Sequence, residues 1–169
     1  MKKYILSLVL IVATASSGVF ATGVLNDDYK FHGMFVMNFL KYVQWQSSSP
    51  EIVVAILGDE SVMPDMERAT NGRQINGKRV VVRRFGKASE LSPDCQAVYI
   101  PANKSGELSQ VVQSVGSSAL IITAKDGLIR KGSCINLIIK DGKWRFEISE
   151  EAAEKAHIKI SNELSKLAI

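Results

Sequence analysis

The chain has 169 residues, of which 46% are hydrophobic and 22% are charged, and its formal net charge is +4. This length fits one domain of ordinary size, and the composition excludes disordered and collagen-like proteins. Its 2 cysteines and 2 histidines are too few for a disulfide-based scaffold and provide no cluster for a structural zinc ion.

The N-terminus has the pattern of an export signal. Two early lysines precede an apolar segment over residues 4–13, which is shorter than the roughly 20 residues that a membrane-spanning helix needs. We place cleavage after Ala21, so residues 1–21 are a signal peptide and residues 22–169 the mature domain; an uncleaved membrane anchor is the alternative. Without the two lysines the formal charge falls to +2, which does not indicate nucleic-acid binding. We therefore expect a soluble periplasmic protein.

Residues 29–45 predict a long first helix that is apolar on nearly all sides. Asp27 and Asp28 precede it and are favourable residues at a helix N-terminus. A helix of this kind must be buried on two sides. In a domain of this size, we expect one side to contact a partner protein or a second copy of the chain. The candidate contact residues are Phe31, Met34, Phe35, Met37, Phe39 and Trp45.

Short strands separated by helices follow the first helix. The continuous apolar run at residues 52–57 is typical of a strand buried on both faces of a parallel sheet. Helices between strands indicate βαβ units, so we predict an α/β domain with a mostly parallel central sheet flanked by helices. The other predicted strands are residues 79–84, 96–100 and 119–123, and the helices run from Asp59 or Ser61 to about residue 70 and over residues 104–115.

The C-terminal part changes to an antiparallel pattern. Asp141-Gly142 joins predicted strands at residues 134–140 and 144–148, and this dipeptide favours a two-residue hairpin because both positions need φ > 0. The second arm alternates between apolar and polar residues, so we expect the hairpin at the edge of the sheet. The remaining predicted elements are two helices capped by Ser149 and Ser161 and an extended segment over residues 158–160.

The sequence contains no recognisable catalytic motif. It has no nucleophile elbow and no glycine-rich phosphate loop, and His32 and His157 are explained as a packing residue and a helix C-terminal residue. The best single candidate is Asp59, which follows a sheet strand where α/β proteins bind ligands, although a helix N-cap also explains it. With Lys125 and Arg130, it makes a binder of a small anionic ligand one candidate function. We expect no metal and no cofactor.

The two cysteines allow a geometric test of the sheet order. Cys95 and Cys134 open the third and fifth predicted strands, and with the fourth strand between them they lie about 9–10 Å apart. A disulfide needs Cα atoms within about 7 Å, so they cannot bond in the simplest order. Export favours oxidation, and a bond between them implies a different order, so both alternatives stay open.

Three ordered stretches resemble the YfiR family of small periplasmic proteins. Residues 35–45 are similar to the family's aromatic-Asn-Phe-x-Lys-aromatic-Val-x-Trp pattern. Residues 76–84 resemble its Gly-x-x-Val-x-Val-Arg-Arg strand and are followed by a similar strand at residues 94–100. The third stretch lies within residues 135–161. Together they cover essentially the whole mature chain in order.

Two positions depart from the family pattern. Gln46 stands where a proline commonly follows the family tryptophan. Cys95 matches a family cysteine, but the position expected for its usual partner holds Ala55. The second departure counts against assuming a family disulfide in this chain.

The resemblance implies a regulator that carries no catalytic residues. YfiR-like proteins restrain a membrane-bound diguanylate cyclase from the periplasmic side, and an outer-membrane lipoprotein with a peptidoglycan-binding domain can sequester them. Such a protein acts by binding the inactive receptor conformation and shifting that population. We therefore expect a non-enzymatic homodimer that binds an inner-membrane sensor/cyclase and lowers cyclic di-GMP signalling.

Overall fold

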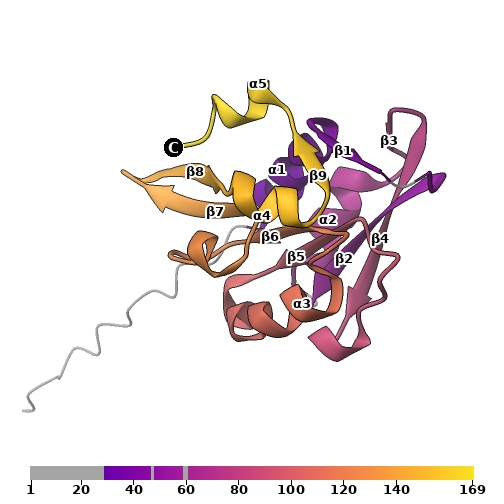
Figure 1. The fold of residues 1–169 in the computed structure, drawn as a ribbon, viewed down its shortest axis with the longest axis horizontal. Helices are drawn as coiled ribbons and strands as arrows, with labels where there is room; N and C mark the ends of the chain where they lie inside the picture. Colours follow the sequence, from indigo (N-terminus) through magenta and orange to yellow (C-terminus); the bar gives the residue numbers. More distant parts are fainter. Residues whose placement is uncertain (1–28, 47, 59–60) are drawn as a thin grey trace, which may run out of the picture.

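A seven-stranded sheet forms the centre of the molecule in the computed structural model, which describes residues 29–46, 48–58 and 61–169 (Figure 1). Its strands are β2 (Glu51–Leu57), β3 (Gln74–Ile75), β4 (Lys78–Phe85), β5 (Ala97–Ile100), β6 (Leu120–Thr123), β7 (Ile135–Lys140) and β8 (Lys143–Ile148). They lie in the order β3-β4-β2-β5-β6-β7-β8. A separate antiparallel pair is formed by β1 (Val43–Trp45) and β9 (Ile158–Ile160).

The central strands β4, β2, β5, β6 and β7 run parallel, which confirms the predicted α/β sheet. Every residue of the apolar run from Ile52 to Leu57 is buried, because elements on both sides of the sheet cover β2. Strand β2 lies between β4 and β5, so the winding of the chain reverses between β2 and β5. In open α/β sheets the carboxyl ends of strands beside such a reversal form the usual ligand crevice.

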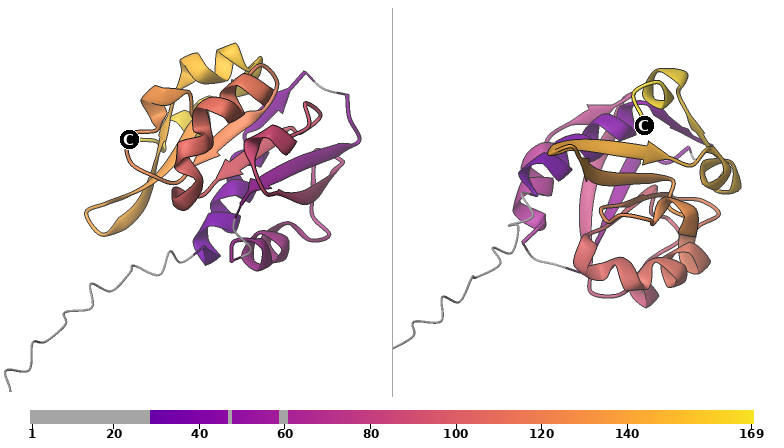
Figure 2. Two further views of the ribbon diagram at one scale, coloured as in Figure 1. Left: turned by 90° about the horizontal axis from the view of Figure 1, so that it is seen from below. Right: turned by 90° about the vertical axis from the view of Figure 1, so that its left-hand side faces the viewer.

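Helices cover both faces of this sheet. The α-helices are α1 (Lys30–Lys41), α2 (Met63–Thr70), α3 (Leu108–Val115), α4 (Glu150–Lys155) and α5 (Asn162–Ser165). Short 3₁₀ turns occur at η1 (Ala88–Glu90), η2 (Ala102–Glu107) and η3 (Ile129–Lys131). The left view of Figure 2 shows α1 and α2 on one side of the sheet and α3 on the other.

The strand at each edge of the sheet runs antiparallel to its neighbour. The predicted hairpin is confirmed: β8 pairs with β7 at one edge, and Asp141 and Gly142 have φ of 52° and 69°. At the other edge, the two-residue strand β3 pairs with β4 through a second turn at Asn76 and Gly77. The sequence indicated this turn but not β3, because two residues are too short to show a periodic pattern.

The first helix is shorter than predicted. It ends at Lys41, and residues 43–45 form β1 instead of a last helical turn. The strand is favoured because Val43 and Trp45 pair in register with Ile160 and Ile158 of β9. The indole nitrogen of Trp45 also donates a hydrogen bond to the backbone oxygen of Gln96, at 2.8 Å, which ties β1 to the start of β5.

Some predictions concern residues that the structure does not describe. The signal peptide over residues 1–21, the helix-capping aspartates at positions 27 and 28, and Asp59 lie outside the described residues. Helix α2 begins at Met63, slightly later than predicted. The caps at Ser149 and Ser161 are confirmed, because each side-chain oxygen accepts a backbone N–H three residues on. None of the described helices is long and apolar enough to span a bilayer.

A glycine lets α1 and α2 approach each other. A Cβ atom added to Gly33 lies 2.7 Å from the backbone oxygen of Asp65 and 2.9 Å from the Cβ of Ala69. We predict that Gly33→Ala destabilises the domain by about 1–3 kcal/mol through overpacking, although alanine is the better helix former. Urea unfolding of both proteins measures this difference.

The matched control is Gly106→Ala, because a Cβ at Gly106 meets nothing within 4 Å. This change should stay within about 0.5 kcal/mol of the wild type. Equal effects of the two substitutions would contradict the close contact between α1 and α2.

Candidate functional site

Helix α1 presents its side chains to three different environments. With 3.6 residues per turn, His32 and Phe39 point toward β8, where their rings lie 4.6 Å from Trp144 and 5.0 Å from Phe146. Gly33 faces α2. The remaining arc faces solvent, so the nearly all-round apolar pattern serves two contacts within the chain and one exposed side.

His32 anchors α1 to the central sheet. It is fully buried, and its Nδ1 atom shares a hydrogen bond with the hydroxyl of Tyr99 on β5. Its ring also contacts Tyr29 edge-on, with centroids 5.4 Å apart. The interpretation of His32 as a packing residue is therefore consistent with its position in the core.

The solvent-facing arc of α1 is unusually apolar. Phe31 is 38% exposed and Met34 50% exposed, while Phe35 is half-buried beside them. Asn38 and Lys41 are the exposed polar residues on the same arc. A helix that packs on one side of a monomer normally turns a polar face to water. We call these five residues the α1 surface.

The other predicted contact residues lie deeper. Met37 is 4% exposed and Phe39 is 1% exposed, because both pack into the core. Trp45 lies on β1 and is half-buried. Of the six candidates, Phe31, Met34 and Phe35 are thus the ones that reach the α1 surface, and their role in partner contact stays a prediction.

A groove of about 310 Å³ runs between α1 and α2 beside the α1 surface. Met34, Met37 and Ala69 provide its apolar lining. Its polar lining consists of Asn38, Lys41, Asp65, Arg68 and Arg73. Arg68 and Asp65 form an ion pair at 2.8 Å, which leaves Lys41 and Arg73 without a carboxylate partner among the described residues.

The structure places two of the three predicted anion-contact residues, Lys125 and Arg130, in different surroundings. Lys125 donates a hydrogen bond from Nζ to the hydroxyl of Ser105, at 3.2 Å. Arg130 lines a different hollow, between α3 and α4, which it shares with Lys155. Because Asp59 lies outside the described residues, binding of an anionic ligand by these three stays a prediction.

Lys104 occupies the crevice beside the sheet reversal. A Cβ atom on Gly58, at the carboxyl end of β2, would lie 2.4 Å from the Cε of Lys104. The ammonium group of Lys104 lies 3.3 Å from Glu107 and from the backbone oxygen of Gly86. Sequence reasoning missed Lys104, because only the fold brings its side chain over β2.

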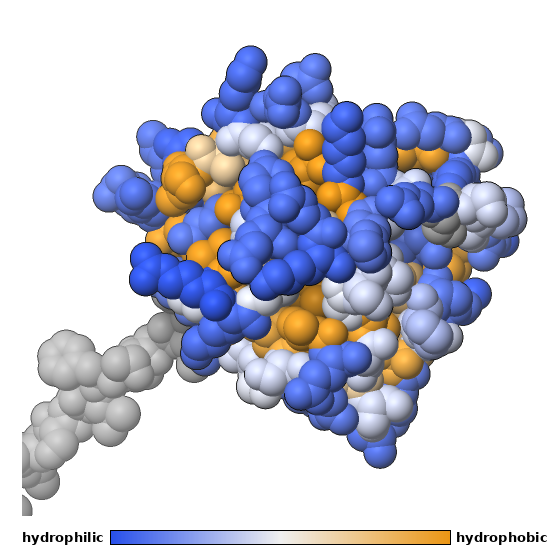
Figure 3. Space-filling view, viewed as in Figure 1, coloured by the Kyte–Doolittle hydropathy of each residue, from blue (hydrophilic) through white to orange (hydrophobic). Residues whose placement is uncertain are grey.

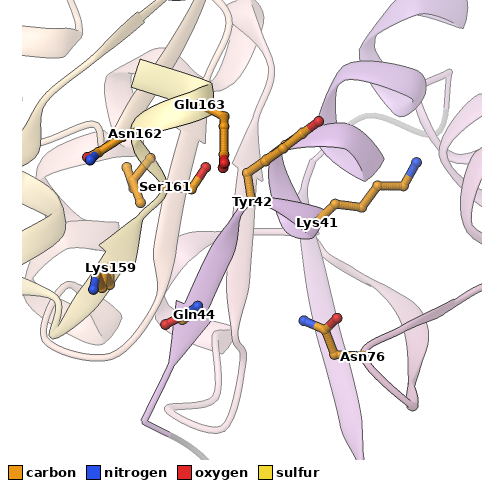
Figure 4. Close-up of a pocket in the computed structure, with 9 residues that line it drawn as sticks. Lys41, Tyr42, Gln44, Asn76, Lys159, Ser161, Asn162 and Glu163 are labelled. Atoms are coloured by element: carbon orange, nitrogen blue, oxygen red, sulfur yellow. The ribbon is translucent and has the colours of Figure 1, made fainter. Parts of the chain in front are cut away.

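A polar hollow of about 550 Å³ lies where β1, β9 and the β3–β4 turn meet (Figure 4). Tyr42 at the end of α1 and Glu163 of α5 line it, together with Asn76 of the β3–β4 turn. Lys41 lines both this hollow and the groove between α1 and α2. The exposed polar lining gives no indication of a reaction.

The face of the molecule seen in Figure 3 carries apolar areas that are separated by polar side chains. No broad apolar area stands out on this face, which is typical of a monomer surface. Among the described helices, α1 is the one that carries exposed large apolar side chains, those of Phe31 and Met34.

A buried polar cluster joins β6, β7 and β8. The side-chain oxygen of Asn136 lies 2.6 Å from the hydroxyl of Thr123 and accepts the backbone N–H of Lys125 at 3.3 Å. Its amide nitrogen donates to Glu147 at 2.9 Å. The hydroxyl of Ser133 adds a contact to Thr123 at 2.8 Å. Asn136 therefore holds the edge hairpin to the parallel part of the sheet.

Both cysteines are buried and free in the structure. Strand β6 lies between β5 and β7, so two strand spacings of about 4.8 Å separate the ends that carry Cys95 and Cys134. The simplest sheet order, in which they cannot bond, is the observed one. Burial raises the pKa of both thiols, that of Cys134 to about 11, and the carboxylate of Asp94 adds to the effect at Cys95.

The raised pKa of Cys134 predicts a loss of stability at alkaline pH. The unfolded thiol ionises near pH 9.0 and the folded one near 11, so the unfolded state gives up its proton first as the pH rises through this range. Linkage then lowers the free energy of unfolding by about 2 kcal/mol at pH 10.5. Chemical unfolding at pH 8 and 10.5, for wild type and for Cys134→Ala, isolates this contribution.

Because other groups also titrate in this range, the decisive quantity is the difference between the two proteins. The variant should lose about 2 kcal/mol less than the wild type between the two pH values. Identical losses would mean that the thiol of Cys134 is not held neutral by the fold.

The described residues contain no group of three or more His, Cys, Asp or Glu side chains that could hold a metal ion. Comparison with protein families finds a match to the model described as DUF4154, YfiR/HmsC-like, over residues 29–169. No curated protein sequence matches the chain. The family match covers most of the chain, including every element described above.

Proposed function

This chain belongs to the YfiR/HmsC-like family, and we propose that it binds the periplasmic part of an inner-membrane diguanylate cyclase and lowers cyclic di-GMP signalling. The family is periplasmic, regulatory and non-enzymatic, and it is associated with control of such cyclases. We also propose that residues 1–21 are a signal peptide that directs this chain to the periplasm.

The observation that carries the proposal is the α1 surface. Phe31 and Met34 are well exposed on a helix whose other sides are already packed against α2 and β8. Exposed apolar side chains that cluster on one element are typical of protein–protein contact sites. Burying them against the cyclase would favour the receptor conformation that offers a complementary surface, and so shift its population toward the inactive state.

Two further partners belong to the same proposal. A second copy of the chain can use the exposed arc of α1, giving a homodimer, and light scattering on the purified mature protein tests this. An outer-membrane lipoprotein can compete for the protein and release the cyclase. A strictly monomeric mature protein would contradict the dimer without affecting the cyclase proposal.

The test of the main proposal is a deletion strain. We expect the intracellular cyclic di-GMP concentration to rise when the gene is deleted and to return to the wild-type level when it is restored. The return should require a cyclase with its periplasmic part intact. An unchanged cyclic di-GMP level in the deletion strain, with the parent strain expressing the protein, would overturn the proposal.

A further inference from the structure

We propose that the groove between α1 and α2 binds an acidic amphipathic helix of the partner, with apolar side chains in the groove and carboxylates against Lys41 and Arg73. This inference rests on the proposed function and specifies the chemistry of the segment that the cyclase would present. The groove and the α1 surface share Met34, Asn38 and Lys41, so one contact can cover both.

The shape of the groove suits an inserted side chain. Its two walls are helices that approach closely at Gly33, and it has a volume of about 310 Å³. Met34 and Met37 line it from one side and Ala69 from the other. Methionine side chains are flexible and polarisable and adapt to different apolar partners. An amphipathic helix placed in an apolar groove is a recurring mode of peptide recognition.

The charges around the groove favour a partner segment with a negative charge. Three cations and one carboxylate line it, and the carboxylate of Asp65 is already paired with Arg68. Within residues 29–46, 48–58 and 61–169, the hydrogen bond of the Lys41 ammonium goes to a neutral amide oxygen, that of Asn38, at 3.4 Å. Lys41 and Arg73 are therefore available to acidic residues that flank the inserted apolar side chains. Such complementarity steers association and excludes basic segments.

A recessed groove favours a protein segment over a membrane surface. Membrane-surface helices insert a protruding apolar face between lipids, whereas Met37 and Ala69 lie between two helices and are not accessible to a flat bilayer. Met37 is only 4% exposed. An anionic membrane therefore meets the rim cations and the exposed Met34, but not Met37 in the depth of the groove.

Two synthetic helical peptides provide the test. Both carry leucines at positions i, i+3, i+4 and i+7; one has glutamates and the other lysines at the remaining sites. We expect the purified mature protein to bind the acidic peptide at least about tenfold more tightly in fluorescence anisotropy. Raising the salt concentration should weaken this binding. Equal binding of the two peptides, or binding of neither, would overturn the inference.

Charge reversal assigns the effect to this groove. Lys41→Glu combined with Arg73→Glu should reverse the peptide preference, while Lys131→Glu combined with Lys166→Glu, an equal charge change at exposed sites elsewhere, should leave it intact. Equal effects of both pairs would overturn the inference. Binding to phosphatidylglycerol vesicles that depends on Lys41 and Arg73, without peptide binding, would also overturn it.

The same variants separate this inference from the proposed function. If the deletion strain shows raised cyclic di-GMP but Lys41→Glu with Arg73→Glu restores full repression, the groove assignment fails and the regulatory proposal stands. If deletion has no effect on cyclic di-GMP, the regulatory proposal fails whatever the peptides show.

Discussion

Replacing Met34 with glutamate should abolish repression of the cyclase while leaving the fold intact. Met34 is 50% exposed and lies both on the α1 surface and in the neighbouring groove. In the free monomer the new carboxylate stays in water, so the free energy of unfolding of the monomer should change by less than about 0.5 kcal/mol. In the complex it would be buried against apolar groups, which weakens binding by about a hundredfold or more.

The measurement is cyclic di-GMP in a deletion strain that expresses the variant, with its periplasmic level checked against the wild type. Leu167→Glu is the matched control, because Leu167 is 64% exposed near the C-terminus and receives the same chemical change. The control should repress normally. Full repression by Met34→Glu at normal protein levels would contradict the assignment of the α1 surface.

Replacing Asn136 with leucine should destabilise the domain by about 2–3 kcal/mol. The change removes the acceptor of the Lys125 backbone N–H and the donor to Glu147, and the hydroxyl of Thr123 loses its contact at 2.6 Å. Asn136 and Thr123 are fully buried, so water cannot replace their contact without opening the sheet, whereas the bonds to Lys125 and Glu147 are only part-buried. Leaving a buried polar group without one of its partners is costly, and the two part-buried bonds add smaller losses.

Urea unfolding of the purified mature protein measures this loss. Asn38→Leu is the control, since Asn38 is exposed on α1 and its replacement should change stability by less than about 0.5 kcal/mol. A second variant, Thr123→Val, tests the cluster itself: combined with Asn136→Leu, it should show a coupling of about 1 kcal/mol or more. Strict additivity would mean that the contacts within the cluster contribute little.

The central part of the fold could be predicted because its signals are local and strong. The continuous apolar run of β2 and the Asp141-Gly142 turn each specify their element without help from the rest of the chain. The end of α1 could not be predicted from the sequence, because residues 43–45 fit an apolar helix as well as a strand. What decides for the strand is its register with β9, more than 100 residues later in the chain.

The candidate site could likewise be predicted only in its local features. An excess of apolar residues in the first helix was evident from the sequence, but not which of them would face solvent. Phe39 and Met37 are used internally because β8 and α2 pack against two sides of α1. The cations of the groove also escaped prediction, since Arg68 and Arg73 come from a separate segment and meet Lys41 only in three dimensions.

Site-specific photo-crosslinking in living cells tests the central claim most directly. A benzophenone amino acid is placed at position 34 or, as a control, at position 167, and crosslinked products are identified by mass spectrometry. We expect position 34, and not position 167, to crosslink to an inner-membrane protein that carries a diguanylate cyclase domain. Crosslinks from position 34 to no protein other than a second copy of this chain would contradict the claim.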